Sequence, residues 1–323
     1  MCYSAAVRAD HAAFQRLFPK SRLALKDFFE LYWRKKAGKP VVRTPRAMDV
    51  QFADPHTQDE HAVYDLIAAH DAAQVIAIEQ DLFKQRKRQA DAIRSLQAKT
   101  TKKAQEDQRI ATAKIDQALA RLARLKRGGG GEADARIFPG WWAPVLMIED
   151  GEPVIRPMRY QCRPAGKPAA YDTKYPGTYN ARRDNLRGFW RGQFGHTHGL
   201  MIVSAFFENV ARHAAEGREL LPGESPENMV LRFEPRPPQD MYVACLYSHW
   251  TSPAAGEPDL WSFAAVTDDP PPEVAAAGHD RCIVQLRPEH VTAWLTPQGR
   301  TLEELDGLLD DKERPYYEHR KAA

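Results

Sequence analysis

The first residues that could do chemistry are Met1 and Cys2, at the start of the 323-residue chain. Cysteine is small enough for methionine aminopeptidase to remove Met1, which would leave Cys2 with a thiol and a free α-amine on one carbon. Their ordinary pKa values, about 8.5 and about 8, make both groups partly nucleophilic near neutral pH. The amine can attack an aldehyde to give a Schiff base, which the thiol then closes into a thiazolidine. Taken alone, a cysteine at position 2 is more often incidental.

Asn180 is the second candidate, within Tyr179-Asn180-Ala181-Arg182-Arg183, after a loop that contains Pro176-Gly177. An asparagine side chain can hydrogen-bond a reacting oxygen or amine, and the two arginines can hold phosphate. The plain alternative is an asparagine that caps a turn, followed by surface arginines.

Glu208 and His279 are candidates for moving protons. Glu208 closes the apolar run Ser204-Ala-Phe-Phe207, and burial beside two phenylalanines would favour its protonated form, which suits proton transfer near neutrality. His279, in His279-Asp280-Arg281, precedes an apolar run that begins at Cys282. Histidine is a natural proton shuttle, and Asp280 or Arg281 could orient it or bind a phosphate. Each residue alone also fits an ordinary strand end or loop.

Several other chemistries have no support. His196-x-His198 has no fitting third ligand and HExxH is absent, so no metal site is expected. A Gly-x-Ser-x-Gly elbow, a Rossmann glycine pattern and a phosphate-binding P-loop are also absent, and no cofactor is expected. The four cysteines form no CxxC pair, which fits a reducing cytosol: Cys2, Cys162, Cys245 and Cys282. With no apolar run near the ~20 residues that span a bilayer and no signal peptide, the sequence predicts a soluble cytoplasmic protein.

The first part of the chain is dominated by helical patterns. Apolar spacing predicts helix over residues 3–36, broken at Pro19, and a proline-rich connector over 37–56. Residues 57–127 contain no Pro or Gly and predict very long helices, with a hairpin tip at Lys99-Thr-Thr-Lys-Lys103. Glycines at 128–131 form a second connector.

The arm over residues 57–127 is strongly basic in its second half. From Lys84 to Arg127 there are 14 Lys or Arg against four acids, although the whole chain carries a net charge of only +3. Such an arm could lie on nucleic-acid phosphates. It could equally be a solvated arm that packs on itself or on a partner subunit, giving self-association.

From residue 132 onward the pattern changes to short strands. Strands are predicted at 143–149, 153–160, 200–207, 229–233, 241–247, 260–267 and 282–286, and helices at 288–295 and 301–309. This pattern predicts an α+β fold, with a mixed or antiparallel sheet wrapped as a partial barrel. Residues 1–36 and 132–323 are expected to form one discontinuous domain that the arm interrupts.

The order of the candidate motifs resembles the SRAP family, the SOS-response-associated peptidases or abasic-site-processing proteins. That family begins Met-Cys and then shows an Asn-Ala-Arg motif, a strand that ends in Phe-Glu, and a His-x-Arg motif before a strand. The matching residues in this chain follow in the same order: Met1-Cys2, Asn180-Ala181-Arg182, Phe206-Phe207-Glu208 and His279-Asp280-Arg281. The resemblance covers residues 1 to about 18 and about 136 to 312.

The chain departs from the family pattern at several positions. Tyr3 and Ser4 stand where Gly and Arg are usual, and Cys282 stands where a basic residue or Met-Pro is common. Tyr160-Gln161 replaces the usual Trp-Gly, although Tyr160 could still stack on a base. Compact members have no counterpart of the arm.

The resemblance implies covalent crosslinking to abasic sites in single-stranded DNA during the DNA-damage or SOS response, described for the family as peptidase- or lyase-like activity with self-processing at Cys2. Cys2 would supply the amine and thiol, Asn180 would hold the amine or a sugar oxygen, and Glu208 would shuttle protons. His279 would orient the opened sugar and assist reversal of the crosslink. The residues implied for DNA binding are Arg182, Arg183, Arg281 and Tyr160.

Two other classes of function stay open at this point. An N-terminal-nucleophile amidohydrolase would also begin Met-Cys, although it usually follows the cysteine with Gly-Ile and alternates two sheets between helical layers. A DNA-binding or scaffolding protein whose pocket has lost catalytic activity would function through the basic arm.

Overall fold

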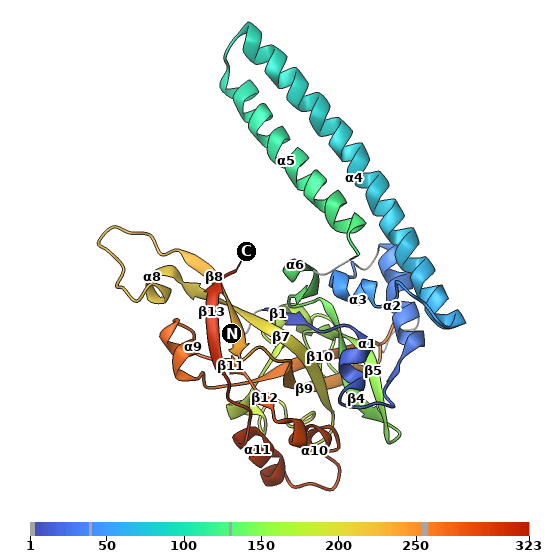
Figure 1. Cartoon of the computed structure of the whole chain (residues 1–323). Coiled ribbons are helices and arrows are strands. Elements are labelled where there is room, and N and C mark those ends of the chain that lie inside the picture. The colour runs from blue at the N-terminus through green and yellow to red at the C-terminus, as the bar shows by residue number, and fades with distance from the viewer. Residues whose placement is uncertain (1–3, 39–40, 129–130, 253–257, 323) are drawn as a thin grey trace.

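The structure is a computed structural model that describes residues 4–38, 41–128, 131–252 and 258–322 (Figure 1). Its strands are β1 (Ser4–Val7), β2 (Arg22–Leu23), β3 (Arg136–Ile137), β4 (Trp142–Glu149), β5 (Glu152–Tyr160), β6 (Asn180–Arg182), β7 (His198–Ala211), β8 (Asn228–Arg236), β9 (Met241–Trp250), β10 (Leu260–Asp268), β11 (Cys282–Ile283), β12 (Gln285–Leu286) and β13 (Tyr316–Lys321). Its helices are α1 (His11–Gln15), α2 (Leu25–Ala37), α3 (Arg46–Val50), α4 (Gln58–Ala98), α5 (Lys102–Lys126), α6 (Glu132–Ala135), α7 (Tyr171–Lys174), α8 (Arg212–Ala215), α9 (Pro272–Ala276), α10 (Val291–Leu295) and α11 (Leu302–Asp310), with short 3₁₀ turns η1 (Arg183–Asn185) and η2 (Pro288–His290).

The strands form one mixed sheet that closes on itself. Neighbouring strands run in the order β9-β10-β5-β4-β7, and β7 pairs in turn with β9, which completes a ring. β4 and β5 form a hairpin whose turn contains Asp150 and Gly151, both with positive φ. The predicted α+β fold with a partial barrel is therefore confirmed.

Both faces of the ring are buried, which explains why its strands are apolar along most of their length. On β9, Val243 and Cys245 belong to one core, while Ala244 and Leu246 belong to the other. The first core also contains residues of β8, β13 and α9, and the second is covered by α1, α10 and α11. Strands covered on both faces lack the polar alternation of a half-exposed sheet.

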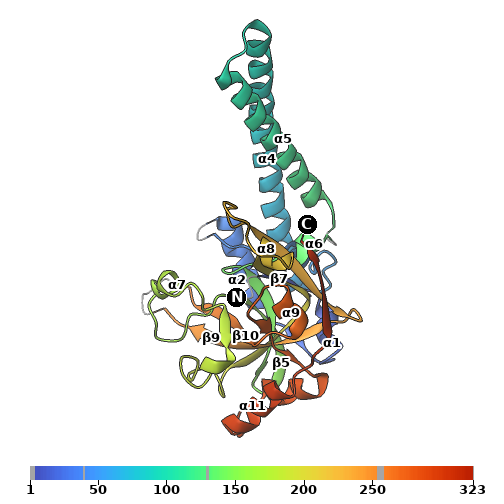
Figure 2. The same cartoon turned by 90° about the vertical axis from the view of Figure 1, so that its left-hand side faces the viewer.

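The basic arm is a helical hairpin that projects from the sheet in both views (Figures 1 and 2). A capping box between Thr57 and Glu60 precedes α4. Thr101 caps the N-terminus of α5, where its hydroxyl accepts from the Ala104 N–H. Apolar residues along the facing sides of the two helices form a continuous seam: Val75, Ile78, Leu82, Ile115, Ala118, Leu122 and Leu125. The predicted long helices and the predicted tip at 99–103 are confirmed.

The base of the hairpin is anchored on the body of the protein. Val63, Leu66 and Ile67 of α4 share a core with Phe28 and Leu31 of α2. Also at the base, in the last turn of α5, the Arg124 guanidinium lies 2.6 Å from the buried Asp134 carboxylate of α6. These contacts fix the direction in which the arm leaves the sheet.

Three predictions about local structure were wrong or incomplete. The helix predicted from residue 3 does not begin there, because residues 4–7 form β1, buried between β3 and β7. The sequence Ser-Ala-Ala-Val has no strong preference of its own, so pairing with two neighbours decides its conformation. The connector at 37–56 contains α3, and the strand β13 at the end of the chain was not predicted.

Gly199 marks the closest approach inside the ring. A Cβ added there would lie 2.8 Å from Cγ1 of Val145 and 3.4 Å from the Leu146 carbonyl oxygen on β4. We expect Gly199→Ala to lower the free energy of unfolding by about 1–3 kcal/mol, because a packed strand must move to admit the methyl group. Urea denaturation measures this change.

Gly307 provides the matched control. It lies inside α11 with nothing within 4 Å of an added Cβ. Gly307→Ala should raise the free energy of unfolding by about 0.5–1 kcal/mol, because alanine favours the helix. Equal effects of the two substitutions would contradict the close approach at Gly199.

Candidate functional site

An extra residue in β7 determines where Glu208 points. On β7, Met201 and Val203 belong to the first core while Leu200 and Ile202 belong to the second. The ladder with β1 then skips Ser204, since Ala6 is opposite Ala205 and Val7 is opposite Val203. Beyond this β-bulge the alternation is inverted, and Phe206 and Val210 lie in the first core. Glu208, between them, therefore faces the first core and is fully buried.

His279 meets Glu208 from the loop after α9. Gly278, with φ of +89°, ends that helix in a left-handed conformation that suits glycine, and an added Cβ would lie 3.1 Å from the Ala214 Cβ. The His279 N–H then donates to the Val274 carbonyl. This backbone geometry places the His279 Nε2 3.0 Å from the Glu208 Oε2.

The Glu208–His279 pair is a buried contact between a carboxyl group and an imidazole ring. His279 Nδ1 lies 2.8 Å from the Arg281 carbonyl oxygen, which can only accept, so Nδ1 carries a hydrogen. The opposite nitrogen faces a carboxyl oxygen. Such a buried pair is suited to giving and taking a proton without water.

Asn180 lies on the same face of the sheet. It is opposite Ala265 of β10, a member of the first core, whereas its neighbour Ala181 belongs to the second. The side chain is buried, and neither its amide nitrogen nor its oxygen has a hydrogen-bond partner among the residues the structure describes. An unsatisfied buried amide is destabilising, so an orphaned one is a candidate ligand-binding group.

Arg182 continues from Asn180 toward the loop of His279. Its guanidinium is exposed and paired with the Asp184 carboxylate at 2.6 Å. Asp184 raises the pKa of Arg182, and the negative charges of Asp280 and Asp269 raise it further. Arg182 is opposite Thr267 of β10, and the end of β10 pairs with β11, which begins three residues after His279, so the end of β6 lies near that loop.

The other predicted DNA-binding residues are placed differently. Arg183 pairs with Asp268 at 3.1 Å and with Asp310 at 2.5 Å, and the largely buried Arg281 side chain lies 3.6 Å from Asp280. Tyr160 is only 2 % exposed, and its ring stacks on Phe263. Stacking on a base requires an exposed ring face, so we revise the role of Tyr160 to support of the core.

The internal cysteines are poor nucleophiles. Burial raises the pKa of the Cys162 thiol to about 12 and raises the pKa of the Cys245 thiol further above its usual value. Burial, followed by the negative charge of Glu208, also raises the pKa of Cys282. Cys2 lies outside the described residues, so the structure gives no geometry for it.

Arg136 is a residue of this region that sequence reasoning missed. Its Nε donates to the Ser4 hydroxyl at 2.9 Å, and its guanidinium lies 3.9 Å from the centre of the Phe207 ring. It therefore places positive charge beside Ser4, the first described residue of β1, on the face of β7 that carries Phe207 and is opposite to the face of Glu208. No motif surrounds Arg136, and only the pairing of β1, β3 and β7 reveals its position.

His198, the second histidine of the His-x-His pair, has a structural role. Burial lowers the pKa of His198 to about 3, which keeps the ring neutral. Its Nδ1 donates to the Trp294 carbonyl at 2.9 Å, and its Nε2 accepts from the Gly195 N–H at 2.8 Å. Both nitrogens are thus occupied. No group of three or more potential metal ligands is found within the described ranges.

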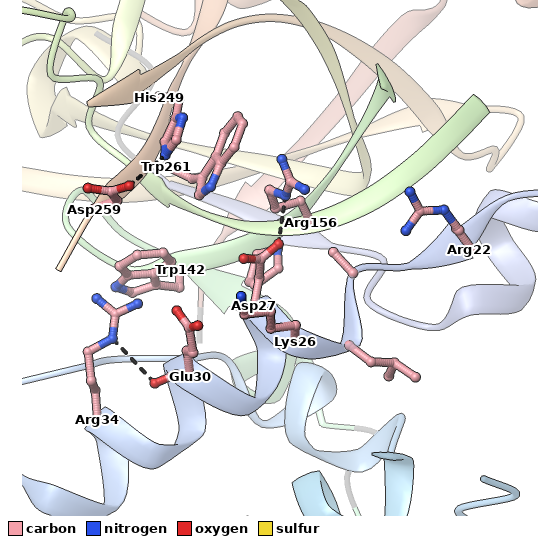
Figure 3. A pocket seen from close by; sticks show the side chains of 13 residues that line it. Arg22, Lys26, Asp27, Glu30, Arg34, Trp142, Arg156, His249, Asp259 and Trp261 are labelled. Atoms are coloured by element: carbon pink, nitrogen blue, oxygen red, sulfur yellow. Dashed lines mark hydrogen bonds and ion pairs between the residues drawn. The ribbon is translucent and has the colours of Figure 1, made fainter. Parts of the chain in front are cut away.

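A separate pocket of about 460 Å³ lies between α2 and the edges of β4, β5, β9 and β10 (Figure 3). The rings of His249 and Trp261 stack with centroids 4.0 Å apart, and the Arg156 guanidinium lies 4.0 Å from the Trp261 ring. Arg156 also pairs with Asp27 and Glu149, each at 2.8 Å. Because these groups satisfy one another, we assign the pocket no catalytic role.

Comparison with known proteins places the chain in a family. The sequence profile of the family described as SOS response associated peptidase (SRAP) matches residues 94–321, well over half of the chain. The chain belongs to the SRAP family, and the family supports a role connected with DNA damage. No curated protein matches it. Among the described residues, no helix is long and apolar enough to cross a membrane.

Three solved structures are similar at low sequence identity. A protein from Bordetella bronchiseptica is 17% identical with a TM-score of 0.46, covering 58% of this chain and 87% of its own. A protein from Bacteroides thetaiotaomicron is 15% identical with a TM-score of 0.46, covering 58% and 78%. A phage-related protein from Bordetella bronchiseptica is 18% identical with a TM-score of 0.43, covering 61% and 85%.

The raised thiol pKa values lead to a prediction about labelling. In a Cys2→Ser variant at pH 8, we expect iodoacetamide to label no cysteine of the folded protein, because Cys162, Cys245 and Cys282 are buried and protonated. After unfolding in urea, all three should be labelled, as intact-mass spectrometry can count. Rapid labelling of any of them in the folded variant would show an internal thiol competent for chemistry.

Proposed function

We propose that this chain uses Cys2, after removal of Met1, to form a covalent thiazolidine with the aldehyde of an abasic site in single-stranded DNA. The observation that carries the proposal is the buried Glu208–His279 pair, 3.0 Å apart, beside the strand that leads to Cys2. Membership in the SRAP family supplies the connection with damaged DNA.

Covalent geometry supports this pairing of Cys2 with the buried site. Ser4 is opposite Phe207 in the β1–β7 ladder, next to Glu208. Two peptide units separate Ser4 from Cys2 and span at most about 7 Å. The covalent chain therefore limits how far the N-terminal amine can lie from the start of β1.

The reaction consists of two bond-forming steps. The Cys2 amine attacks the aldehyde carbon of the opened sugar, and loss of one water gives the imine. The thiolate then adds to the imine carbon, and the nitrogen takes up a proton, which closes the five-membered ring. Glu208 and His279 provide the proton for opening the sugar and for loss of water, and they can return it when the ring reopens.

The remaining residues position the substrate. Asn180, with its unpartnered buried amide, holds the amine or a sugar oxygen. Arg182 is exposed enough to meet a phosphate next to the lesion, and Arg183 and Arg281 add positive charge. Arg136 donates to the hydroxyl of Ser4, which stands where the family pattern has an arginine, and so supplies positive charge at that position.

The chemistry also requires that Met1 be absent. A chain that keeps Met1 has an amide in place of the free amine at Cys2 and cannot form the imine. The three internal thiols do not substitute for Cys2, because each is buried with a raised pKa and none has an α-amine.

The test uses single-stranded DNA with one abasic site and a denaturing gel. We expect the wild-type protein to give a covalent adduct and Cys2→Ala to give none. Glu208→Gln should form the adduct about 100-fold more slowly, because glutamine cannot donate or accept a proton as a carboxyl group does. Cys245→Ala and the exposed Glu152→Gln are matched controls that should leave the rate unchanged.

The alternatives make different predictions in the same assay. Hydrolysis of glutamine without an adduct would support an amidohydrolase. Salt-sensitive binding to DNA with neither reaction would support a binding module without chemistry. Either outcome would overturn the proposal.

A further inference from the structure

The distal half of the α4–α5 hairpin carries positive charge that the rest of the fold does not neutralise. Of the 14 Lys and Arg from Lys84 to Arg127, four lie in ion pairs within the described chain: Arg88, Arg94, Arg109 and Arg124. The other ten are exposed and have no carboxylate within 4.0 Å among described residues: Lys84, Arg86, Lys87, Lys99, Lys102, Lys103, Lys114, Arg121, Lys126 and Arg127. Like charges at this density repel, so they favour a polyanionic partner.

The charges surround a groove between the two helices. The groove is about 630 Å³, and its charged lining consists of Lys84, Lys87, Arg88, Lys103 and Lys114 with two acids, Asp91 and Asp107. Both acids are already engaged, Asp107 by Arg88 at 2.5 Å and Asp91 by Arg94 at 2.5 Å. Four lysines therefore remain to contact a ligand.

The shape and composition of the groove favour a stiff, regular polyanion. α5 has 25 residues, so the free hairpin is about 37 Å long, close to one turn of duplex DNA. The groove has no aromatic lining residue, whereas proteins that bind single strands use aromatic rings to stack bases. Lysines without aromatics suit contacts to a phosphate backbone, independent of sequence.

We propose that the α4–α5 hairpin binds the phosphate backbone of duplex DNA through the lysines of this groove. The rigid anchoring of α4 on α2 and of α5 on α6 holds the arm in a fixed direction from the sheet (Figure 2). Binding by the arm adds contacts to intact duplex DNA, and these are separate from the chemistry proposed at Cys2.

The competing occupant is a second copy of the chain. Ile76 and Phe83, seven residues apart on α4, are 57% and 75% exposed and are not among the residues that line the groove. An apolar stripe of this kind fits a helical partner. The experiment below therefore measures oligomeric mass as well.

The test measures binding of undamaged 30-base-pair duplex DNA, without abasic sites, by fluorescence anisotropy over a range of KCl concentrations. The variant is Lys87→Gln/Lys103→Gln/Lys114→Gln, in which glutamine keeps the helical propensity. We expect the slope of log K against log salt to become shallower by about 2.7, since each lost phosphate contact removes about 0.9. The control, Lys20→Gln/Lys26→Gln/Lys36→Gln, removes the same charge from exposed positions on the body and should keep the slope.

Two results would overturn the proposal. One is an unchanged slope in the groove variant, which would mean that the groove lysines do not contact DNA phosphates. An equal change of slope in the control would likewise count against the groove, because general charge would then account for binding. The other is a halved mass of the groove variant in light scattering, which would show that the groove joins two copies. Because the probe has no aldehyde, either result is independent of whether Cys2 forms an adduct.

Discussion

The orientation of Glu208 is the constraint on which the site depends. β7 contributes to the barrel ring through its first half and to the site through its second half, and Ser204 is the extra residue between them. Without the bulge, the alternation of β7 would carry Glu208 toward the opposite face, away from His279. One inserted residue thus lets an apolar barrel strand present a carboxylate on the face where Asn180 also lies.

A fully buried carboxyl beside a buried imidazole is hard to explain by stability alone. Desolvation of an ionisable pair offsets most of its attraction, and an apolar pair of similar volume is often equally stable. The core that Glu208 faces contains the apolar residues Phe206 and Val210 and the buried Cys282. A histidine–carboxyl pair in such a place fits proton transfer in a reaction that excludes water. The buried and unpartnered amide of Asn180 fits the same interpretation.

The sequence was sufficient for the fold class and the arm but insufficient for the geometry of the site. Long runs without Pro or Gly identified α4 and α5, and apolar runs separated by turns identified β4, β5, β7, β9 and β10. The strand at residues 4–7 was missed because its conformation comes from pairing with β3 and β7. The bulge at Ser204 and the position of Arg136 have the same origin, since neither has a local pattern. Tyr160 was expected to be able to stack on a base, and its burial follows from the two covered faces of the sheet.

Mass spectrometry of the adduct tests the central claim most directly. The protein is reacted with abasic single-stranded DNA without any reducing agent, digested with nuclease and protease, and mapped. The account predicts a modified peptide that begins at Cys2, lacks Met1, and weighs one water less than its two components. An adduct that maps to a lysine of the arm, or that appears only after borohydride reduction, would contradict the account, because a thiazolidine needs neither.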